Sequence, residues 1–299
     1  MLFGRKRQPR FVTLAGQLEN AARLSSFDRE VPSSWRGPVF SPKRIVRKAA
    51  AGVDGVTWQD YEAADLEPRL EDAHRRIHRG AYRPQPSRRT YIPKADGKQR
   101  PLAISALEDK IVQGATVMVL NAIYEGDFVG FSYGFRPGRG PHDALDALST
   151  AIKIRKVNWV LDADIQNFFG SVSQDWLGRF LEHRIGDKRI IRLIQKWLKA
   201  GILEDGVVTI DDRGTGQGSV IAPFLANVHL HYRFDLWAER WRRHEARGDM
   251  IVVRYADDLV VGFEKEDGAR RFLDAMRDRM RCVTGLGNFS CRSIRTRPV

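Results

Sequence analysis

Residues 250–263 contain two apolar, largely β-branched runs with the adjacent carboxylates Asp257 and Asp258 between them. β-Branched runs that flank a short polar segment predict a β-hairpin, with the aspartates at its tip. A further apolar strand is predicted over 159–165, and it carries Asp164 close to its end. Carboxylates inside apolar strands need cations or partners, because burying an unpaired charge is expensive. The pattern therefore predicts that the strands bring Asp164 and Asp257 together.

An all-oxygen site built from Asp257 beside Asp164 suits Mg²⁺. Two such ions ~3.5–4 Å apart can activate an attacking hydroxyl and stabilise a leaving pyrophosphate in an in-line displacement. The alternative interpretation is an ordinary turn, because Asp favours turns. Two adjacent aspartates alone fit that alternative. The sequence Tyr-Ala-Asp-Asp at 255–258, between hydrophobic strands and downstream of Asp164, favours the metal site.

The composition indicates a polyanionic partner. Lysine and arginine number 50 against 37 acidic residues, so the 299-residue chain has a net charge of +13. Such a charge predicts salt-sensitive binding of nucleic acid. The length allows one large domain or two to three subdomains. The two cysteines, Cys282 and Cys291, are too few for a disulfide scaffold or a zinc site. With no secretory signal and no membrane-spanning run, the sequence predicts a cytoplasmic protein.

Two segments concentrate positive charge. Residues 1–50 hold eleven lysines and arginines against three acidic residues, and this basic arm is either a nucleic-acid contact or a solvated terminus. The strand 90–93 and the turn that follows it place Lys94, Lys98 and Arg100 near one hairpin tip. These cations could clamp a phosphate chain, although an ordinary basic hairpin is the favoured interpretation of this segment taken alone.

Glycine-rich and helical segments complete the pattern. Residues 130–140 interleave aromatics with Arg136 and Arg139, which suits base stacking, or they cap a core under a tight loop. The glycines of 214–219 lack the sixth-position glycine of a dinucleotide fingerprint and the Gly-Lys-Ser/Thr of a P-loop. Apolar spacing predicts helices over 61–78, 107–124, 142–154 and 267–280.

Five motifs in order carry a resemblance to a known family. They are Arg100-Pro101-Leu102, the loop 131–138, Asp162-Ala163-Asp164-Ile165 with Phe168-Phe169, Gly214-Thr215-Gly216-Gln217-Gly218 with Ala222-Pro223, and Tyr255-Ala256-Asp257-Asp258. Over roughly residues 52–280, the sequence resembles a bacterial group II intron-encoded reverse transcriptase/maturase.

The resemblance implies an α+β right-hand polymerase with fingers and palm, in which helices back an antiparallel palm sheet. The implied divisions are a basic N-terminal segment of uncertain fold at 1–50, fingers at 51–155, an incomplete palm at 156–280 and an atypical tail at 281–299. The implied activity is RNA-directed DNA polymerisation by two-metal nucleotidyl transfer. It would require Mg²⁺, an RNA template such as intron RNA, a DNA primer and deoxynucleoside triphosphates, with no role for a membrane.

The resemblance also assigns residues. Asp164, Asp257 and Asp258 would be the catalytic metal ligands. Phe169 would lie under the sugar and exclude the ribose 2′-hydroxyl by steric clash. The implied nucleotide-binding residues, besides Phe169, are Lys94 and Arg100 at the triphosphate and Gln217 and Gly218 in a loop that approaches nucleotide and template.

The sequence departs from the family pattern at several positions. Gly170 stands where the family commonly has Asp, Gly216 where it has Pro, and Ala222 where it has Ser. After Met280 the family's strand and thumb are not recognisable, which predicts a frameshifted or truncated reading frame, an exposed palm edge and weak or absent polymerase activity. A lineage-specific tail is the alternative for residues 281–299.

Two other functions are compatible with parts of this pattern. A non-catalytic intron-RNA-binding remnant would use the basic surface alone. A retroelement polymerase that mutates its own template is disfavoured, because that family favours Ser-Gln where Ala222-Pro223 stand.

Overall fold

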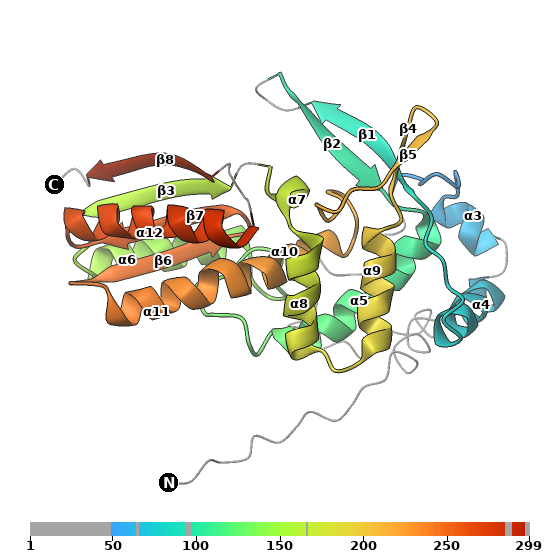
Figure 1. The fold of residues 1–299 in the computed structure, drawn as a ribbon, viewed down its shortest axis with the longest axis horizontal. Helices are drawn as coiled ribbons and strands as arrows, with labels where there is room; N and C mark the ends of the chain where they lie inside the picture. Colours follow the sequence, from blue (N-terminus) through green and yellow to red (C-terminus); the bar gives the residue numbers. More distant parts are fainter. Residues whose placement is uncertain (1–48, 64–65, 94–96, 166, 285–288, 297–299) are drawn as a thin grey trace, which may run out of the picture.

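Two four-stranded sheets and the helices packed around them make up the computed structural model of the chain (Figure 1). The structure describes residues 49–63, 66–93, 97–165, 167–284 and 289–296, with side chains up to residue 280. The separate helices and mainly antiparallel strands confirm the expected α+β class. We call the sheet β6-β7-β3-β8 sheet I and the sheet β2-β1-β4-β5 sheet II.

Sheet I is antiparallel throughout. Its strands are β3 (Trp159–Ile165), β6 (Met250–Tyr255), β7 (Asp258–Phe263) and β8 (Phe289–Thr296). β3 is hydrogen-bonded to β7 on one side and to β8 on the other. The hairpin β6–β7 has the bounds that its β-branched runs predicted.

One face of sheet I is packed into the main hydrophobic core. Successive side chains of a strand point to opposite faces, so Leu161 and Ala163 lie in the core while Asp162 and Asp164 lie on the other face and stay half-buried. Helices cover the core face (Figure 1). They are α10 (Ala222–Leu230), the π-helix η4 (His231–Asp235), α11 (Leu236–His244) and α12 (Glu266–Thr284).

Sheet II forms a ribbon that projects from the upper side of the molecule in Figure 1, between sheet I and the end that carries α3 and α4. The hairpin β1–β2 is antiparallel, β4 joins β1 in parallel, and β5 pairs antiparallel with β4. The strands are β1 (Ser87–Pro93), β2 (Gln99–Ile104), β4 (Ile202–Glu204) and β5 (Val207–Thr209). The remaining helices are α3 (Trp58–Ala63), α4 (Leu66–His78), α5 (Leu107–Tyr124), α6 (Pro141–Ile154), α7 (Phe168–Ser171), α8 (Gln174–Arg184) and α9 (Lys188–Leu198).

The expectation of an exposed sheet edge beside β3 is wrong. β8 pairs with β3 from Trp159↔Thr296 to Ile165↔Phe289 and covers that edge. Strand pairing is made by backbone hydrogen bonds, so a segment that departs from the family pattern can still pair with β3. The register shifts once, between Asp162 and Ala163.

Helix predictions were confirmed in large part. α5 has the expected bounds and α6 differs by one residue. Of the helix expected over 61–78, the described residues are helical in α3, which ends at Ala63, and in α4, which ends at His78 as predicted. Residues 1–48 of the basic arm, which include all of its lysines and arginines, lie outside the described residues. In the described part of the chain, no helix is long and apolar enough to cross a bilayer.

Candidate active site

Three aspartates meet at one end of sheet I. Asp164 in β3 lies directly opposite Asp258 in β7, and paired residues of antiparallel strands point to the same face. Asp257 shares the two-residue turn between β6 and β7 with Ala256. Like charges placed opposite each other destabilise a sheet. The strands therefore hold a carboxylate arrangement that carries an electrostatic penalty.

The titration of Asp257 reflects this arrangement. Burial is the largest influence and raises the pKa of Asp257 above its usual value. The charges of Asp258 and Asp164 raise this pKa further, whereas a backbone hydrogen bond and the charge of Arg100 lower it. The three carboxylates thus lie within electrostatic reach of one another and of a cation on sheet II.

The donor set fits Mg²⁺ in its chemistry, because it consists of carboxylate oxygens with a concentrated negative charge. Among the described residues, no group of three or more His, Cys, Asp or Glu side chains is arranged to hold a metal ion. Asp164, Asp257 and Asp258 would therefore have to turn towards one another to bind one.

The turn that carries Asp257 has a strained backbone. Ala256 has φ +55°, a left-handed value that a residue with a side chain rarely adopts. The segment 131–134 packs along β6 and onto this turn: Arg254 N–H donates to the Phe131 carbonyl and Tyr133 N–H donates to the Arg254 carbonyl, both at 2.9 Å. A Cβ atom on Gly134 would lie 2.2 Å from the Ala256 nitrogen. We call residues 130–140 the glycine-aromatic loop and residues 256–257 the aspartate turn. The glycine-aromatic loop therefore helps to support the aspartate turn.

Phe169 lies in α7, beyond the end of β3 that carries Asp164. Asn167 enters this helix with φ +49°, and the Phe169 ring contacts the rings of Phe168 and Phe135 at centroid distances of 5.6 and 6.3 Å. The Phe169 carbonyl accepts a hydrogen bond of 2.9 Å from Thr215 N–H. This bond joins α7 to the glycine-rich loop.

The glycine-rich loop crosses from α7 to sheet II. The Gln217 carbonyl accepts a hydrogen bond of 2.7 Å from Ala103 N–H in β2. Gly218 has φ +106°, and a Cβ there would lie 3.3 Å from the Ala103 carbonyl oxygen. The Gln113 side chain on α5 accepts from the N–H of Val220 at 3.0 Å. Glycine at 218 permits both the left-handed backbone and the close approach to β2.

The predicted phosphate-binding cations differ in what the structure shows of them. Lys94 lies outside the described residues. Arg100 is exposed on β2, opposite Ile92 of β1, and its charge reaches Asp257. Arg100 thus lies within electrostatic reach of Asp257, and the loop of Gln217 and Gly218 packs against the same strand, β2.

Arg136 is a structural residue rather than an exposed nucleic-acid contact. Its side chain is 2% exposed and forms an ion pair of 2.6 Å with Glu125. It also donates to the carbonyls of Val129 and Ser132, at 2.8 and 2.7 Å. Arg139 lies over the Tyr133 ring at 5.3 Å. Of the two interpretations of residues 130–140, Arg136 supports the one in which the loop caps a core.

The sequence interpretation overlooked Arg254. This residue lies in the middle of the apolar strand β6, and its side chain is completely buried next to the aspartate turn. A charged residue in a run that is otherwise Met-Ile-Val-Val was the available signal.

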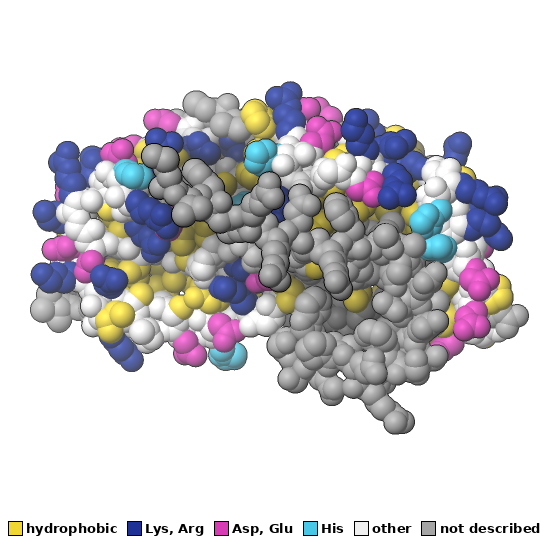
Figure 2. Space-filling model, turned by 90° about the horizontal axis from the view of Figure 1, so that it is seen from below, with side chains coloured by type: hydrophobic (Ala, Val, Ile, Leu, Met, Phe, Trp, Pro, Cys, Tyr) yellow, Lys and Arg dark blue, Asp and Glu magenta, His cyan; other side chains and the backbone are white. Residues whose placement is uncertain are grey.

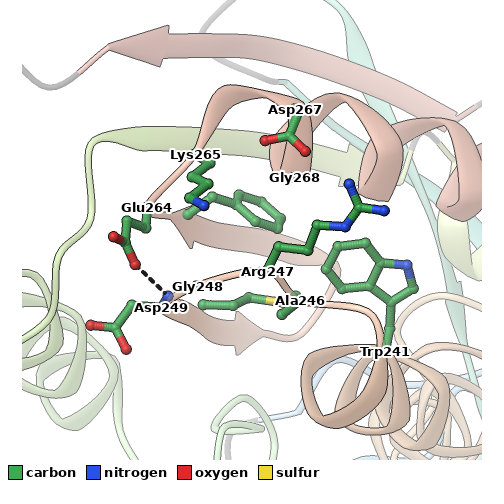
Figure 3. Close-up of a pocket in the computed structure, with 11 residues that line it drawn as sticks. Trp241, Ala246, Arg247, Gly248, Asp249, Glu264, Lys265, Asp267 and Gly268 are labelled. Carbon is green, nitrogen blue, oxygen red and sulfur yellow. Dashed lines mark hydrogen bonds between the residues drawn. The ribbon is translucent and has the colours of Figure 1, made fainter.

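Two recesses lie away from the aspartates. Figure 3 shows the first, between the start of β6 and the end of β7, where Asp249 N–H donates to Glu264 at 3.0 Å. Its volume of about 10 Å³ is room for about one water molecule. The second, of about 720 Å³, lies along α8, α9 and residues 210–213. Its charged lining residues have mixed signs: Asp175, Arg179, Glu182, Lys199, Asp211, Asp212 and Arg213.

Comparison with known proteins identifies the family. The family described as "Reverse transcriptase (RNA-dependent DNA polymerase)" matches residues 92–286. The chain belongs to this family. Its relatives include Protein YkfC of Escherichia coli, 34% identical over 78% of this chain and 67% of that protein. The group II intron-encoded protein LtrA of Lactococcus lactis is 36% identical over 55% of this chain and 27% of that protein. The relatives of this reverse transcriptase thus include a group II intron-encoded protein.

A solved structure supports the same fold. The apo telomerase of Candida tropicalis, truncated from its C-terminal domain, matches with a TM-score of 0.54 and 13% sequence identity. The match covers 77% of this reverse transcriptase and 55% of the telomerase chain. The fingers and palm expected from the sequence are thus confirmed as a fold class. The chain spans between about a quarter and two thirds of the length of these three proteins.

Proposed function

We propose that this reverse transcriptase extends a DNA primer on an RNA template by two-metal nucleotidyl transfer. The observation that carries the proposal is the cross-strand pair Asp164–Asp258 with Asp257 in the adjoining turn. Their mutual repulsion would be offset by Mg²⁺. Bound there, Mg²⁺ would activate the primer 3′-hydroxyl and stabilise the leaving pyrophosphate.

The residues around the aspartates would hold the nucleotide. Arg100, whose charge reaches Asp257, would bind the triphosphate together with Lys94. The Phe169 ring would lie under the deoxyribose, where a 2′-hydroxyl would clash with it. Gln217 and Gly218 would let the loop backbone approach the base pair, because their segment is held against β2.

The template and primer would be bound through positive charge. The net charge is +13, and in Figure 2 the lysine and arginine side chains are distributed over the visible described part of the face rather than gathered in one patch. Distributed cations favour contact with a long phosphate backbone over a single phosphate. We propose intron RNA as the template class, with a DNA primer and deoxynucleoside triphosphates.

Primer extension on poly(rA) with an oligo(dT) primer tests the catalytic proposal. Asp257→Asn removes a metal-binding charge without changing side-chain volume, and we expect extension to fall at least ~10³-fold while the fold is retained. Asp175→Asn is the matched control, since Asp175 is 71% exposed and forms a surface ion pair with Arg179 at 3.0 Å. Extension by the Asp257→Asn variant at the wild-type rate would overturn the assignment.

A second candidate is RNA binding without catalysis. Two observations favour it. Among the described residues, no three metal-ligating side chains are already arranged to hold a metal ion, and the net charge of +13 suits RNA. Under this function the wild-type protein binds RNA but shows no extension at any Mg²⁺ concentration, and Asp257→Asn changes neither property.

A further inference from the structure

All five guanidinium N–H groups of Arg254 are used by neighbours. Nε and Nη2 donate to the two carboxylate oxygens of Asp235 at 2.7 and 2.6 Å. Nη1 donates to the Asn227 side chain at 3.1 Å and to the Ala256 carbonyl at 2.9 Å. Nη2 also donates to Ser132 Oγ at 2.5 Å. An arginine offers five donors in a fixed plane, so these bonds satisfy it completely.

The four partners of Arg254 come from four different segments. Asp235 ends the π-helix η4, Asn227 lies in α10, Ser132 belongs to the glycine-aromatic loop, and Ala256 lies in the aspartate turn. Asn227 extends the connection, because its amide donates to the Gly134 carbonyl at 2.7 Å. One side chain therefore ties the aspartate turn to the loop that packs on it and to the helices beneath it.

The backbone of the turn needs such support. A residue with a side chain in the left-handed region is strained, and strain of this kind persists where the surroundings over-determine the conformation. Ala256 has φ +55°, its carbonyl accepts from Arg254, and Gly134 approaches its nitrogen closely. Asp257 follows Ala256 directly, so the orientation of the Ala256 peptide sets where the Asp257 carboxylate points.

Stability alone does not account for the ion pair. Arg254 and Asp235 are both 0% exposed. Exchanging a buried ion pair for apolar residues of similar volume is often neutral or stabilising, whereas removing one partner is strongly destabilising. A geometric role explains why an arginine stands in the apolar strand β6.

We propose that Arg254 is a positioning residue of the polymerase site. It holds the Ala256–Asp257 peptide, and the loop 131–134 against it, in the orientation that the aspartates need. This inference rests on the proposed function of Asp257 and Asp258 for its catalytic consequence. The prediction that Arg254 keeps residues 131–134 and the turn well ordered does not depend on catalysis.

The test replaces the ion pair as a unit. In the double variant Arg254→Met, Asp235→Leu, no charge is left unpaired, so the fold should be retained. We expect kcat for primer extension to fall ~10²-fold, in line with a displacement of about 1 Å at a reacting centre. The KM for the nucleotide should stay within about threefold, since Arg100 and the glycine-rich loop are untouched. Hydrogen exchange of the amides in 131–134 and 255–258 should accelerate at least ~10-fold relative to the rest of sheet I.

A matched control removes an ion pair elsewhere. Arg76 on α4 and Glu108 on α5 pair through bonds of 3.0 and 2.7 Å. The double variant Arg76→Met, Glu108→Leu should leave kcat and the exchange of 131–134 and 255–258 unchanged.

Milder variants keep the proposal testable if the first one fails to fold. Ser132→Ala removes one acceptor, and Arg254→Lys supplies three donors in place of five. Both should accelerate exchange in 131–134 and 255–258. The proposal would be overturned if both of these variants fold and their exchange is unchanged. It would also be overturned if the Arg254→Met, Asp235→Leu variant folds and has wild-type kcat and exchange. If the wild-type protein shows no extension, the proposed function fails, and accelerated exchange in the variants still supports the structural role of Arg254.

Discussion

The approach of Gly134 to the aspartate turn makes a sharp prediction. In Gly134→Ala, the added Cβ would lie 2.2 Å from the Ala256 nitrogen and 2.9 Å from its Cα. Both contacts are to backbone, so no side-chain rotation can relieve them. Gly134 has no positive φ, and the effect is therefore steric rather than conformational.

The distances set the size of the effect. Cβ atoms essentially never approach other heavy atoms within 3.0 Å, so the loop and the turn must part by at least about 0.8 Å. Overpacking of this kind costs ~1–3 kcal/mol of stability. A shift approaching ~1 Å at the aspartates should lower kcat ~10²-fold, which is ~2.7 kcal/mol of barrier.

Primer extension and urea unfolding measure the two effects. Gly130→Ala is the control, because it lies in the same loop, has no positive φ and has open space where its Cβ would stand. It should change kcat by less than about twofold. If Gly134→Ala folds and extends primers as fast as Gly130→Ala, the contact between loop and turn does not position the site.

Three further results are expected. Phe169→Val should raise the ratio of kcat/KM for UTP to that for dTTP by roughly 10–100-fold, because the ring would no longer contact the sugar; an unchanged ratio in single-nucleotide incorporation would contradict this. Binding of single-stranded RNA should weaken at least ~10²-fold between 50 and 200 mM salt in filter-binding or anisotropy assays, and a flat profile would exclude the basic surface as the footprint. Burial raises the pKa of Asp109 to about 6, against hydrogen bonds from Tyr82 and Gln85 that lower it. Between pH 4 and 6 the folded state therefore binds more protons than the unfolded state. The Asp109 contribution to the free energy of unfolding should then fall as pH rises through this window. Urea titrations of Asp109→Asn should lack this pH-dependent fall in the free energy of unfolding.

Elements with local periodicity could be predicted from the sequence. α5 and the hairpin β6–β7 have the expected bounds, since helical spacing and β-branched runs are properties of neighbouring residues. The presence of Asp164 and Asp257 in one site was predicted from the unfavourable burial of carboxylates in apolar strands. The structure adds that Asp258, rather than Asp257, lies opposite Asp164. That register depends on the two-residue turn and could not be deduced from the strands alone.

Features that depend on distant contacts could not be predicted. β8 has no marked apolar alternation, and its strand conformation comes from pairing with β3. The burial of Arg136 depends on Glu125 and on two loop carbonyls. The Arg254–Ser132 contact joins residues 122 positions apart. No pattern in either segment identifies the other.

The central place of β3 in sheet I has a consequence for synthesis. Both neighbours of this strand, β7 and β8, follow it in the chain. Asp258 leaves the ribosome 94 residues after Asp164. At ~5–20 residues per second, that interval is roughly 5–20 s. During this time the apolar strand containing Trp159 and Leu161 has neither hydrogen-bonding neighbour. The nascent chain therefore passes through a stage in which chaperone binding to residues 159–165 would protect it from aggregation.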